Sequence, residues 1–96
     1  MKMLFIAYNE AIDEEVMEIL DANAVASYTK WAKVLGKGKA SGPHLQSQVW
    51  PKANNVLMIA AADEQAGKIV QDIRGLRTTL SHEGVKAFVL PLEEAT

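Results

Sequence analysis

The run best suited to chemistry is a short alternation of glycine and lysine: Gly36, Lys37, Gly38 and Lys39. Glycine leaves backbone N–H groups open to close approach and lysine adds ammonium groups, and together they can cradle a phosphate or a carboxylate. The same run would also suit a solvated hairpin tip, where glycine serves the turn. It is not a Walker loop, which would need glycine at Lys33, serine or threonine at Ala40, and a following helix.

Positive charge is concentrated around this run. No acidic residue lies between Asp21 and Asp63, and half of the ten basic side chains fall within residues 28–55: Lys30, Lys33, Lys37, Lys39 and Lys52. The formal net charge of the chain is −2. A local concentration of this kind attracts anions even in a slightly negative protein. We therefore expect a small anionic ligand near this segment.

The histidines give little support for a metal site or for catalysis. His44 and His82 are separated by an expected strand and helix, and the chain has no cysteine. A metal site needs three or four converging ligands. No Ser–His–Asp or paired-carboxylate spacing indicates a catalytic site. We expect a non-enzymatic protein without a metal site, with His82 at a helix end and His44 as a loop residue that can contact a ligand.

Two further groups of side chains have structural interpretations. Tyr28, Trp31 and Trp50 flank the basic run, but three aromatic residues in a negatively charged chain favour a packed hairpin or a subunit contact over nucleic-acid binding. The acids of residues 10–18 alternate with an apolar stripe and indicate a solvated helix face. No nucleic-acid partner is expected.

The apolar pattern predicts one α+β domain with the order strand, helix, strand, strand, helix, strand. The expected strands are 2–8, 25–35, 56–62 and 85–92, and the first helix is expected over 10–23. Asn9 and Asp63 are expected helix N-caps, and Gly84 is expected to end the second helix. This order matches the ferredoxin-like sandwich, a four-stranded antiparallel sheet with both helices on one face.

The expected strands do not alternate between apolar and polar residues, as the runs MLFIAY, VLMIAAA and AFVLPL show. A sheet with one face in water would alternate. The second face is therefore expected to be covered by another copy of the chain, which predicts a homo-oligomer. The first apolar run is too short for a signal peptide and nothing approaches the roughly 20 apolar residues of a membrane span. A cytoplasmic protein that is not inserted in a membrane is expected.

With this element order, the chain resembles the PII-like signalling proteins, whose superfamily also contains the CutA-like proteins. The resemblance covers essentially the whole chain, and it is more specific in Tyr28–Thr29, in the run 36–39 and in Lys86-Ala87-Phe88-Val89. It implies a ferredoxin-like subunit in a homotrimer. It also implies adenine nucleotides or similar anionic effectors in clefts between subunits, and a loop after the second strand that contacts a partner protein, such as a membrane transporter.

The ligand-binding residues expected from the run and the resemblance together are Tyr28, Thr29, Gly36, Lys37, Gly38, Lys39, His44 and Lys86. The chain departs from the pattern of the classical members in three places. Its loop has no tyrosine for nucleotidylylation, the turn at residues 83–86 lacks a second glycine, and the ending PLEEAT has no arginine. We therefore expect a shortened sensor that binds a smaller or different anion.

Two alternatives stay open. One is a CutA-like trimer in which the hairpin mainly builds the assembly and a divalent metal binds weakly. The other is a structural interaction module without a small ligand.

Overall fold

The computed structural model describes residues 1–37, 52–80 and 84–96. Its elements follow the predicted order: β1 (Lys2–Asn9), the 3-10 helix η1 (Glu10–Ile12), α1 (Asp13–Ala22), β2 (Thr29–Gly36), β3 (Lys52–Ala61), α2 (Asp63–Thr79) and β4 (Val85–Pro91). Among the described residues, no helix is long and apolar enough to cross a membrane.

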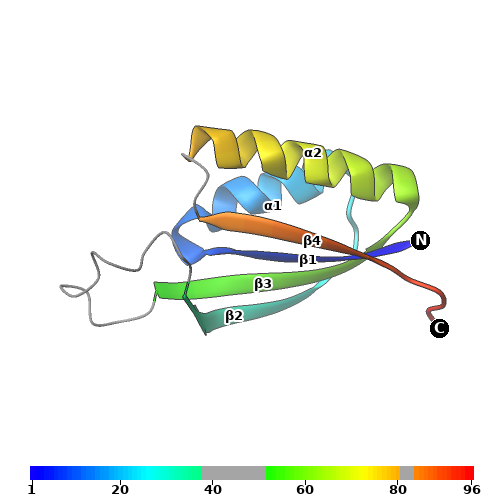
Figure 1. Ribbon diagram of the computed structural model, residues 1–96, viewed down its shortest axis with the longest axis horizontal. Helices are drawn as coiled ribbons and strands as arrows, with labels where there is room; N and C mark the ends of the chain where they lie inside the picture. Colours follow the sequence, from blue (N-terminus) through cyan, green and yellow to red (C-terminus); the bar gives the residue numbers. More distant parts are fainter. Residues whose placement is uncertain (38–51, 81–83) are drawn as a thin grey trace.

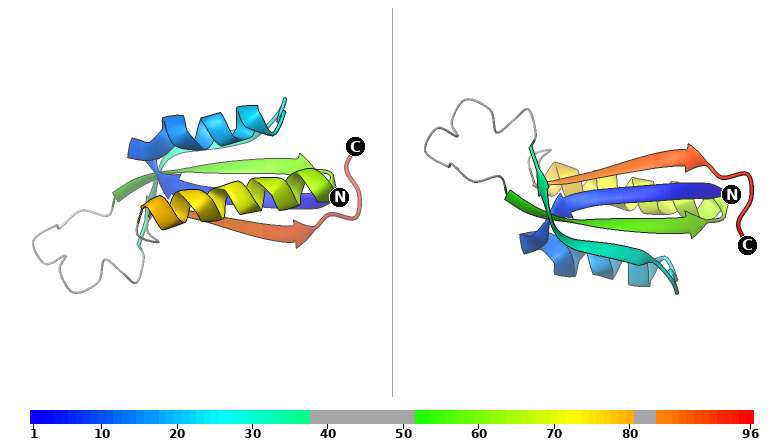
Figure 2. Two further views of the ribbon diagram at one scale, coloured as in Figure 1. Left: turned by 90° about the horizontal axis from the view of Figure 1, so that it is seen from above. Right: turned by 90° about the horizontal axis from the view of Figure 1, so that it is seen from below.

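The four strands form one sheet in the order β2-β3-β1-β4, and every neighbouring pair is antiparallel. Both helices cover the same face of this sheet (Figure 1). Seen from above, the helices lie in front of the sheet, and seen from below, the sheet lies in front of the helices (Figure 2). The prediction of a ferredoxin-like sandwich is confirmed. We call the sheet face under the helices the inner face and the opposite one the outer face.

The hydrophobic core lies between the inner face and the helices. Every second residue of β1 and β3 is buried there, because successive side chains of a strand point to opposite faces. The helices contribute residues one turn apart, the spacing that gives one apolar stripe. The central members of this core are Leu4, Ile6, Leu57, Ile59, Val16, Leu20, Ile69 and Ile73.

The helix starts follow the expected chemistry with one correction. The side chain of Asn9 accepts a hydrogen bond from the Ala11 N–H at 2.9 Å, which confirms it as a cap. The expected cap at Asp63 is wrong by one residue, because Ala62 is the N-cap and Asp63 begins α2. Asp63 instead lies 3.0 Å from the amino group of Met1. It remains in the first helical turn, where an acid complements the helix dipole.

The end of α1 explains why β2 begins later than the sequence predicts. Ala24 has a left-handed backbone with φ of 57°. The Ala24 N–H donates to Asp21 O at 3.1 Å and the Val25 N–H donates to Leu20 O at 3.0 Å. These two bonds make a Schellman motif, which satisfies carbonyls of the last helical turn. Residues 25–28 therefore form the connection between the helix and the sheet, and the strand begins at Thr29.

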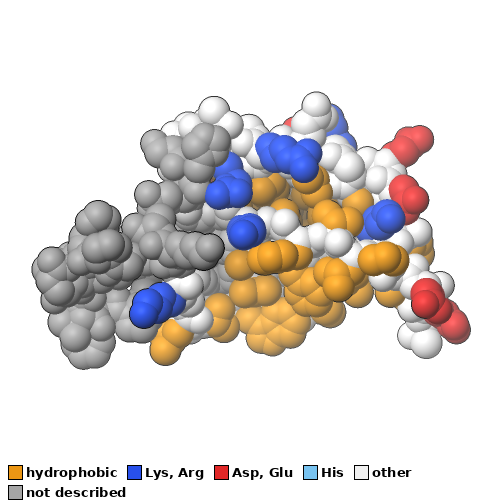
Figure 3. Space-filling view, in the orientation of Figure 1, with side chains coloured by type: hydrophobic (Ala, Val, Ile, Leu, Met, Phe, Trp, Pro, Cys, Tyr) orange, Lys and Arg blue, Asp and Glu red, His pale blue; other side chains and the backbone are white. Residues whose placement is uncertain are grey.

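The outer face of the sheet is apolar, as the lack of alternation predicted. Cross-strand register places Thr29, Met58, Phe5 and Phe88 in one row across the four strands. Hydrophobic side chains gather over this part of the molecule, below the helices (Figure 3). Phe88 and Leu90 are each nearly half exposed. A contiguous apolar surface of this kind marks a site of association.

Candidate functional site

Several of the expected ligand-binding residues lie at one end of the sheet, where β2 ends and β3 and β4 begin. Gly36 pairs with Lys52, and the N–H of Asn9 donates to Gly84 O at 2.8 Å just before β4. Lys37 follows Gly36 directly, and Lys86 pairs with Ala7 near the end of β1. The chain thus brings Gly36, Lys37 and Lys86 to the same end of the sheet. Gly38, Lys39 and His44 lie outside the described residues.

Gly36 allows the side chain of a neighbouring residue to approach closely. A Cβ atom placed on this residue would collide with the side-chain nitrogen of Asn54 on the adjacent strand. Gly36 does not have a positive φ, in contrast to Gly84 with φ of 86°. Glycine was expected here so that a ligand could come close to the backbone. Within the subunit, the group that comes close to the Gly36 backbone is the Asn54 amide.

Lys37 and Lys86 are exposed cations at this end of the sheet. The Nζ of Lys86 lies 5.6 Å from the centroid of the Phe88 ring, within the range of a cation–π contact. Within the described ranges, neither lysine has a carboxylate at ion-pair distance. Both ammonium groups are therefore accessible to an anion.

Tyr28 and Thr29 lie at the opposite end of β2. Thr29 pairs with Met58, whereas Gly36 pairs with Lys52 at the far end of the same strand. The length of β2 separates Thr29 from Gly36, a distance of roughly 20 Å at the rise of a strand. A single subunit therefore does not bring Tyr28 and Thr29 together with Gly36 and Lys37.

Two of the five lysines in the basic segment are already paired. Lys30 Nζ lies 2.7 Å from Asp13 Oδ1, and Lys33 Nζ lies 2.6 Å from Glu10 Oε1. Acids of the same subunit therefore already balance part of the positive charge that the sequence concentrates in this segment. Among the lysines of the segment whose side chains are described, Lys37 remains as the accessible cation.

A family model for nitrogen regulatory protein P-II matches residues 1–96, the whole chain. The chain belongs to this family. It is a PII-like signalling protein, which confirms the resemblance inferred from its sequence, and the P-II family consists of signalling regulators. No curated protein sequence matches the chain.

Solved structures of other PII-like proteins share the fold. CPII of Thiomonas intermedia K12 bound to ADP, AMP and acetate has a TM-score of 0.70 and 21% identity, covering 92% of this P-II chain and 81% of CPII. The same protein bound to ADP, AMP and bicarbonate gives 0.68 and 24%, covering 93% and 84%. A PII-like signalling protein of Thermus thermophilus gives 0.64 and 21%, covering 93% and 82%.

Sequence reasoning missed a polar cluster on the inner face of this P-II subunit. Asp13 Oδ1 accepts hydrogen bonds from Tyr8 OH at 2.5 Å, Lys30 Nζ at 2.7 Å and Asn55 Nδ2 at 3.2 Å. We call these four side chains the Asp13 cluster. The hydrogen bond from Lys30, followed by that from Tyr8, holds the pKa of Asp13 below its usual value. Burial, followed by the hydrogen bond to Asp13, raises the pKa of Tyr8.

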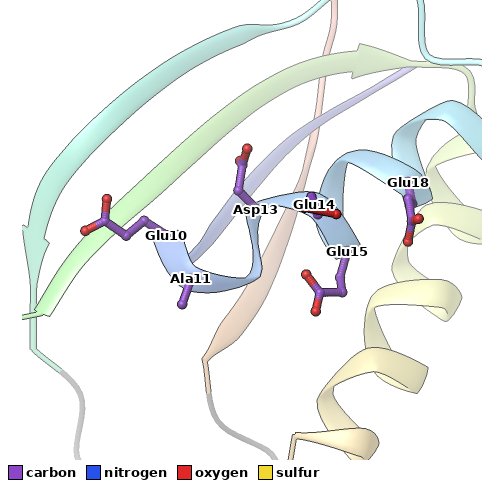
Figure 4. A pocket seen from close by; sticks show the side chains of 6 residues that line it. All are labelled: Glu10, Ala11, Asp13, Glu14, Glu15 and Glu18. Atoms are coloured by element: carbon purple, nitrogen blue, oxygen red, sulfur yellow. The ribbon is translucent and has the colours of Figure 1, made fainter.

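The acidic residues of η1 and α1 lie around a shallow open hollow. Its lining residues are Glu10, Ala11, Asp13, Glu14, Glu15 and Glu18. Their carboxylates point in different directions and do not converge on one point (Figure 4). Among the described residues, no group of three acidic, histidine or cysteine side chains could hold a metal ion. This geometry agrees with a solvated face for the glutamates, whereas Asp13 belongs to the cluster beneath them.

Proposed function

We propose that this P-II chain is a non-enzymatic sensor that forms a homotrimer and binds an anionic effector of the adenine-nucleotide class between subunits. It regulates a partner protein, with a membrane transporter as one candidate, through the segment that follows β2, and it acts in the cytoplasm. The observation that carries the proposal is the pair of accessible ammonium groups, Lys37 and Lys86, at one end of the sheet. CPII, which has the same fold, has been solved with ADP, AMP and bicarbonate.

The distribution of exposed apolar side chains supports a ring of subunits. Apart from Met1, the large hydrophobic side chains that are exposed in the described residues all lie on or beside the two edge strands: Tyr28, Trp31, Leu35, Phe88, Val89 and Leu90. An exposed edge strand is a template for pairing with another chain. Contact between β2 of one copy and β4 of the next joins two different surfaces, and such head-to-tail contacts form a ring when the rotation between neighbours closes. Three copies is the number that the family implies.

A ring of this kind would also bring Lys37 and Lys86, which lie at the two opposite edges of the sheet in one subunit, to a single seam. Thr29 would remain roughly 20 Å along β2 from Gly36, given the rise of a strand, so the seam holds only part of the expected residues. The seam between β2 of one copy and β4 of the next holds Gly36 and Lys37 from the first and Lys86 from the second. Two ammonium groups favour phosphate oxygens, because charge-assisted hydrogen bonds are the stronger ones.

Calorimetric titration with ADP, AMP, bicarbonate and a divalent cation such as Mn²⁺ tests this function. We expect ADP or AMP to bind, and Lys37→Ala or Lys86→Ala to weaken binding about tenfold, on the order of 1.4 kcal/mol. Lys68→Ala is the matched control, since Lys68 lies on α2 and contacts Asp72. Absence of nucleotide binding by the unaltered protein would contradict the proposal. Binding of the cation alone would support the CutA-like alternative.

A further inference from the structure

β2 contains a bulge at the point where it faces the Asp13 cluster. Trp31 pairs with Val56 and Val34 pairs with Asn54, so Ala32 and Lys33 together stand opposite the single residue Asn55. Two residues opposite one is the defining arrangement of a β-bulge. Lys33 has φ of 59°, a left-handed conformation that is uncommon for a residue other than glycine.

The bulge determines which residues at the end of β2 lie on the outer face of the sheet. Trp31 and Val34 are three positions apart, yet both pair with residues of the outer face, whereas in a regular strand they would lie on opposite faces. The extra residue therefore reverses the alternation of everything that follows it. Gly36 lies on the outer face, opposite Lys52, only because the bulge precedes it. Loss of the bulge by a slip of one residue would turn Gly36 to the other face.

The Asp13 cluster holds this bulge in place. The N–H of Lys33 donates to Asn55 Oδ1 at 3.1 Å, and Asn55 Nδ2 donates to Asp13 Oδ1 at 3.2 Å. Asn55 is only 5% exposed, and these two hydrogen bonds provide partners for both ends of its amide inside the protein. Asp13 is bound in turn by Tyr8 and Lys30. The bulge is thereby attached to β1, β3 and the start of α1.

We propose that Asp13 and Asn55 are positioning residues for the effector: by fixing the β2 bulge, they determine the face on which Gly36 lies and the direction in which the chain reaches Lys37. The inference rests on the proposed function. Both residues belong to the cluster on the inner face, whereas Lys86 and Gly36 belong to the outer face. They act on the effector through the register of β2 and do not touch it.

Two variants and one control test the proposal. Asn55→Ala removes the acceptor of the Lys33 N–H, and Asp13→Asn removes the carboxylate that holds Asn55. Asp72→Asn is the control, since Asp72 is also a partly buried carboxylate that accepts from an asparagine, Asn23 at 2.9 Å, but it connects α1 to α2. Asp13 is more exposed than Asn55, so Asp13→Asn keeps the test open should Asn55→Ala fail to fold.

The first measurement is hydrogen exchange at the backbone amides of residues 33–37 without any ligand. We expect exchange to be about tenfold faster or more in Asn55→Ala and Asp13→Asn, because the local opening that exposes these amides becomes easier. Asp72→Asn should leave it unchanged. Unchanged exchange in the two cluster variants would overturn the role of the cluster in holding the bulge, whether or not the protein binds a nucleotide.

The second measurement is the affinity for ADP, determined by calorimetry at a temperature at which all variants are folded. A loss of about tenfold or more is expected in both cluster variants and less than about twofold in Asp72→Asn. A merely structural cluster would lower the melting temperature of the variants and leave the ADP affinity of the folded protein unchanged, which would overturn the positioning role. Failure of the unaltered protein to bind ADP would overturn the proposed function and, with it, this role, while the exchange result would still stand.

Deletion of Lys33 gives a rescue experiment. Without the extra residue, Ala32 alone stands opposite Asn55, and residues 34–36 keep their observed partners in a regular strand. Adding Asn55→Ala to this deletion should then cost less than about twofold in ADP affinity. A loss as large as in the undeleted chain would show that Asn55 acts by some route other than the bulge and would overturn the inference.

Discussion

The side chain of Asn55 closes the bulge that stands opposite it, because its Oδ1 accepts the N–H of Lys33 at 3.1 Å. The same amide donates to Asp13, so one buried asparagine links an irregular strand to the start of a helix. A buried polar group that loses its partner costs about 1–3 kcal/mol. We therefore expect the irregular end of β2 to be less stable without this asparagine beneath it.

The pH dependence of stability should report on the same cluster. Because its hydrogen bonds hold the pKa of Asp13 low in the folded state, the ionised carboxyl stabilises the fold above its unfolded pKa of about 3.9. That contribution is lost as the pH falls through the lower folded pKa. Asp13→Asn should therefore lower the free energy of unfolding near neutral pH, and it should have a smaller effect in strong acid.

Urea unfolding at neutral pH and in strong acid checks this expectation. Glu14→Gln is the control, because Glu14 lies on the exposed side of the same helical turn and outside the cluster. An equal effect of Asp13→Asn at both pH values would show that its ionised form contributes nothing to stability.

Ala24→Gly should stabilise the protein. Ala24 is exposed and has φ of 57°, a conformation that costs an L-residue about 1–2 kcal/mol and glycine almost nothing. Allowing for the greater freedom of glycine in the unfolded chain, we expect a gain of about 1 kcal/mol in the free energy of unfolding. Ala22→Gly, two residues earlier in the helix, should destabilise by about 1 kcal/mol. Urea titration measures both, and a loss in Ala24→Gly would contradict the left-handed assignment.

Gly36→Ala should destabilise the protein, because its new methyl group would meet the amide of Asn54. Overpacking costs about 1–3 kcal/mol, and we expect the lower end of that range, about 1 kcal/mol, because the Asn54 amide is the end of a side chain that can turn away. Gly67→Ala is the matched control, since nothing lies within 4 Å of the added carbon, and in mid-helix it should gain about 0.5–1 kcal/mol. Combining Gly36→Ala with Asn54→Ala should recover most of the loss, and no recovery would mean that another contact requires glycine.

The sequence predicted the fold because the fold follows from repeated patterns. Continuous apolar runs identified β1, β3 and β4, and the apolar stripe containing Val16 and Leu20 identified α1. The late start of β2 was not predictable, since the left-handed turn at the end of α1 is made by Ala24, which has no compositional signal.

The site was less predictable, because its register depends on a bulge. Trp31, Ala32 and Lys33 are all compatible with a regular strand, and nothing in the run reveals the extra residue. Asp13 was grouped with the solvated acids of its helix. The available signal was Asn55, a polar residue at an inward position at the start of an apolar run, where a buried polar partner must be sought.

Phe88→Glu should prevent the subunits from associating. Phe88 is 47% exposed on the outer face of an edge strand, in the same cross-strand row as Phe5 and Met58. A carboxylate there would have to be buried without a partner when another copy covers the face, which costs several kcal/mol.

Gln71→Glu adds the same charge on the exposed side of α2 and should leave association unchanged. Light scattering should give about three times the subunit mass of 10.5 kDa for the unaltered chain and for Gln71→Glu, and about one subunit mass for Phe88→Glu. A Phe88→Glu variant that remains trimeric would show that the outer face and its edge do not join the copies. An unaltered chain that is already monomeric would show the same, and the ligand site would then have to form within one subunit.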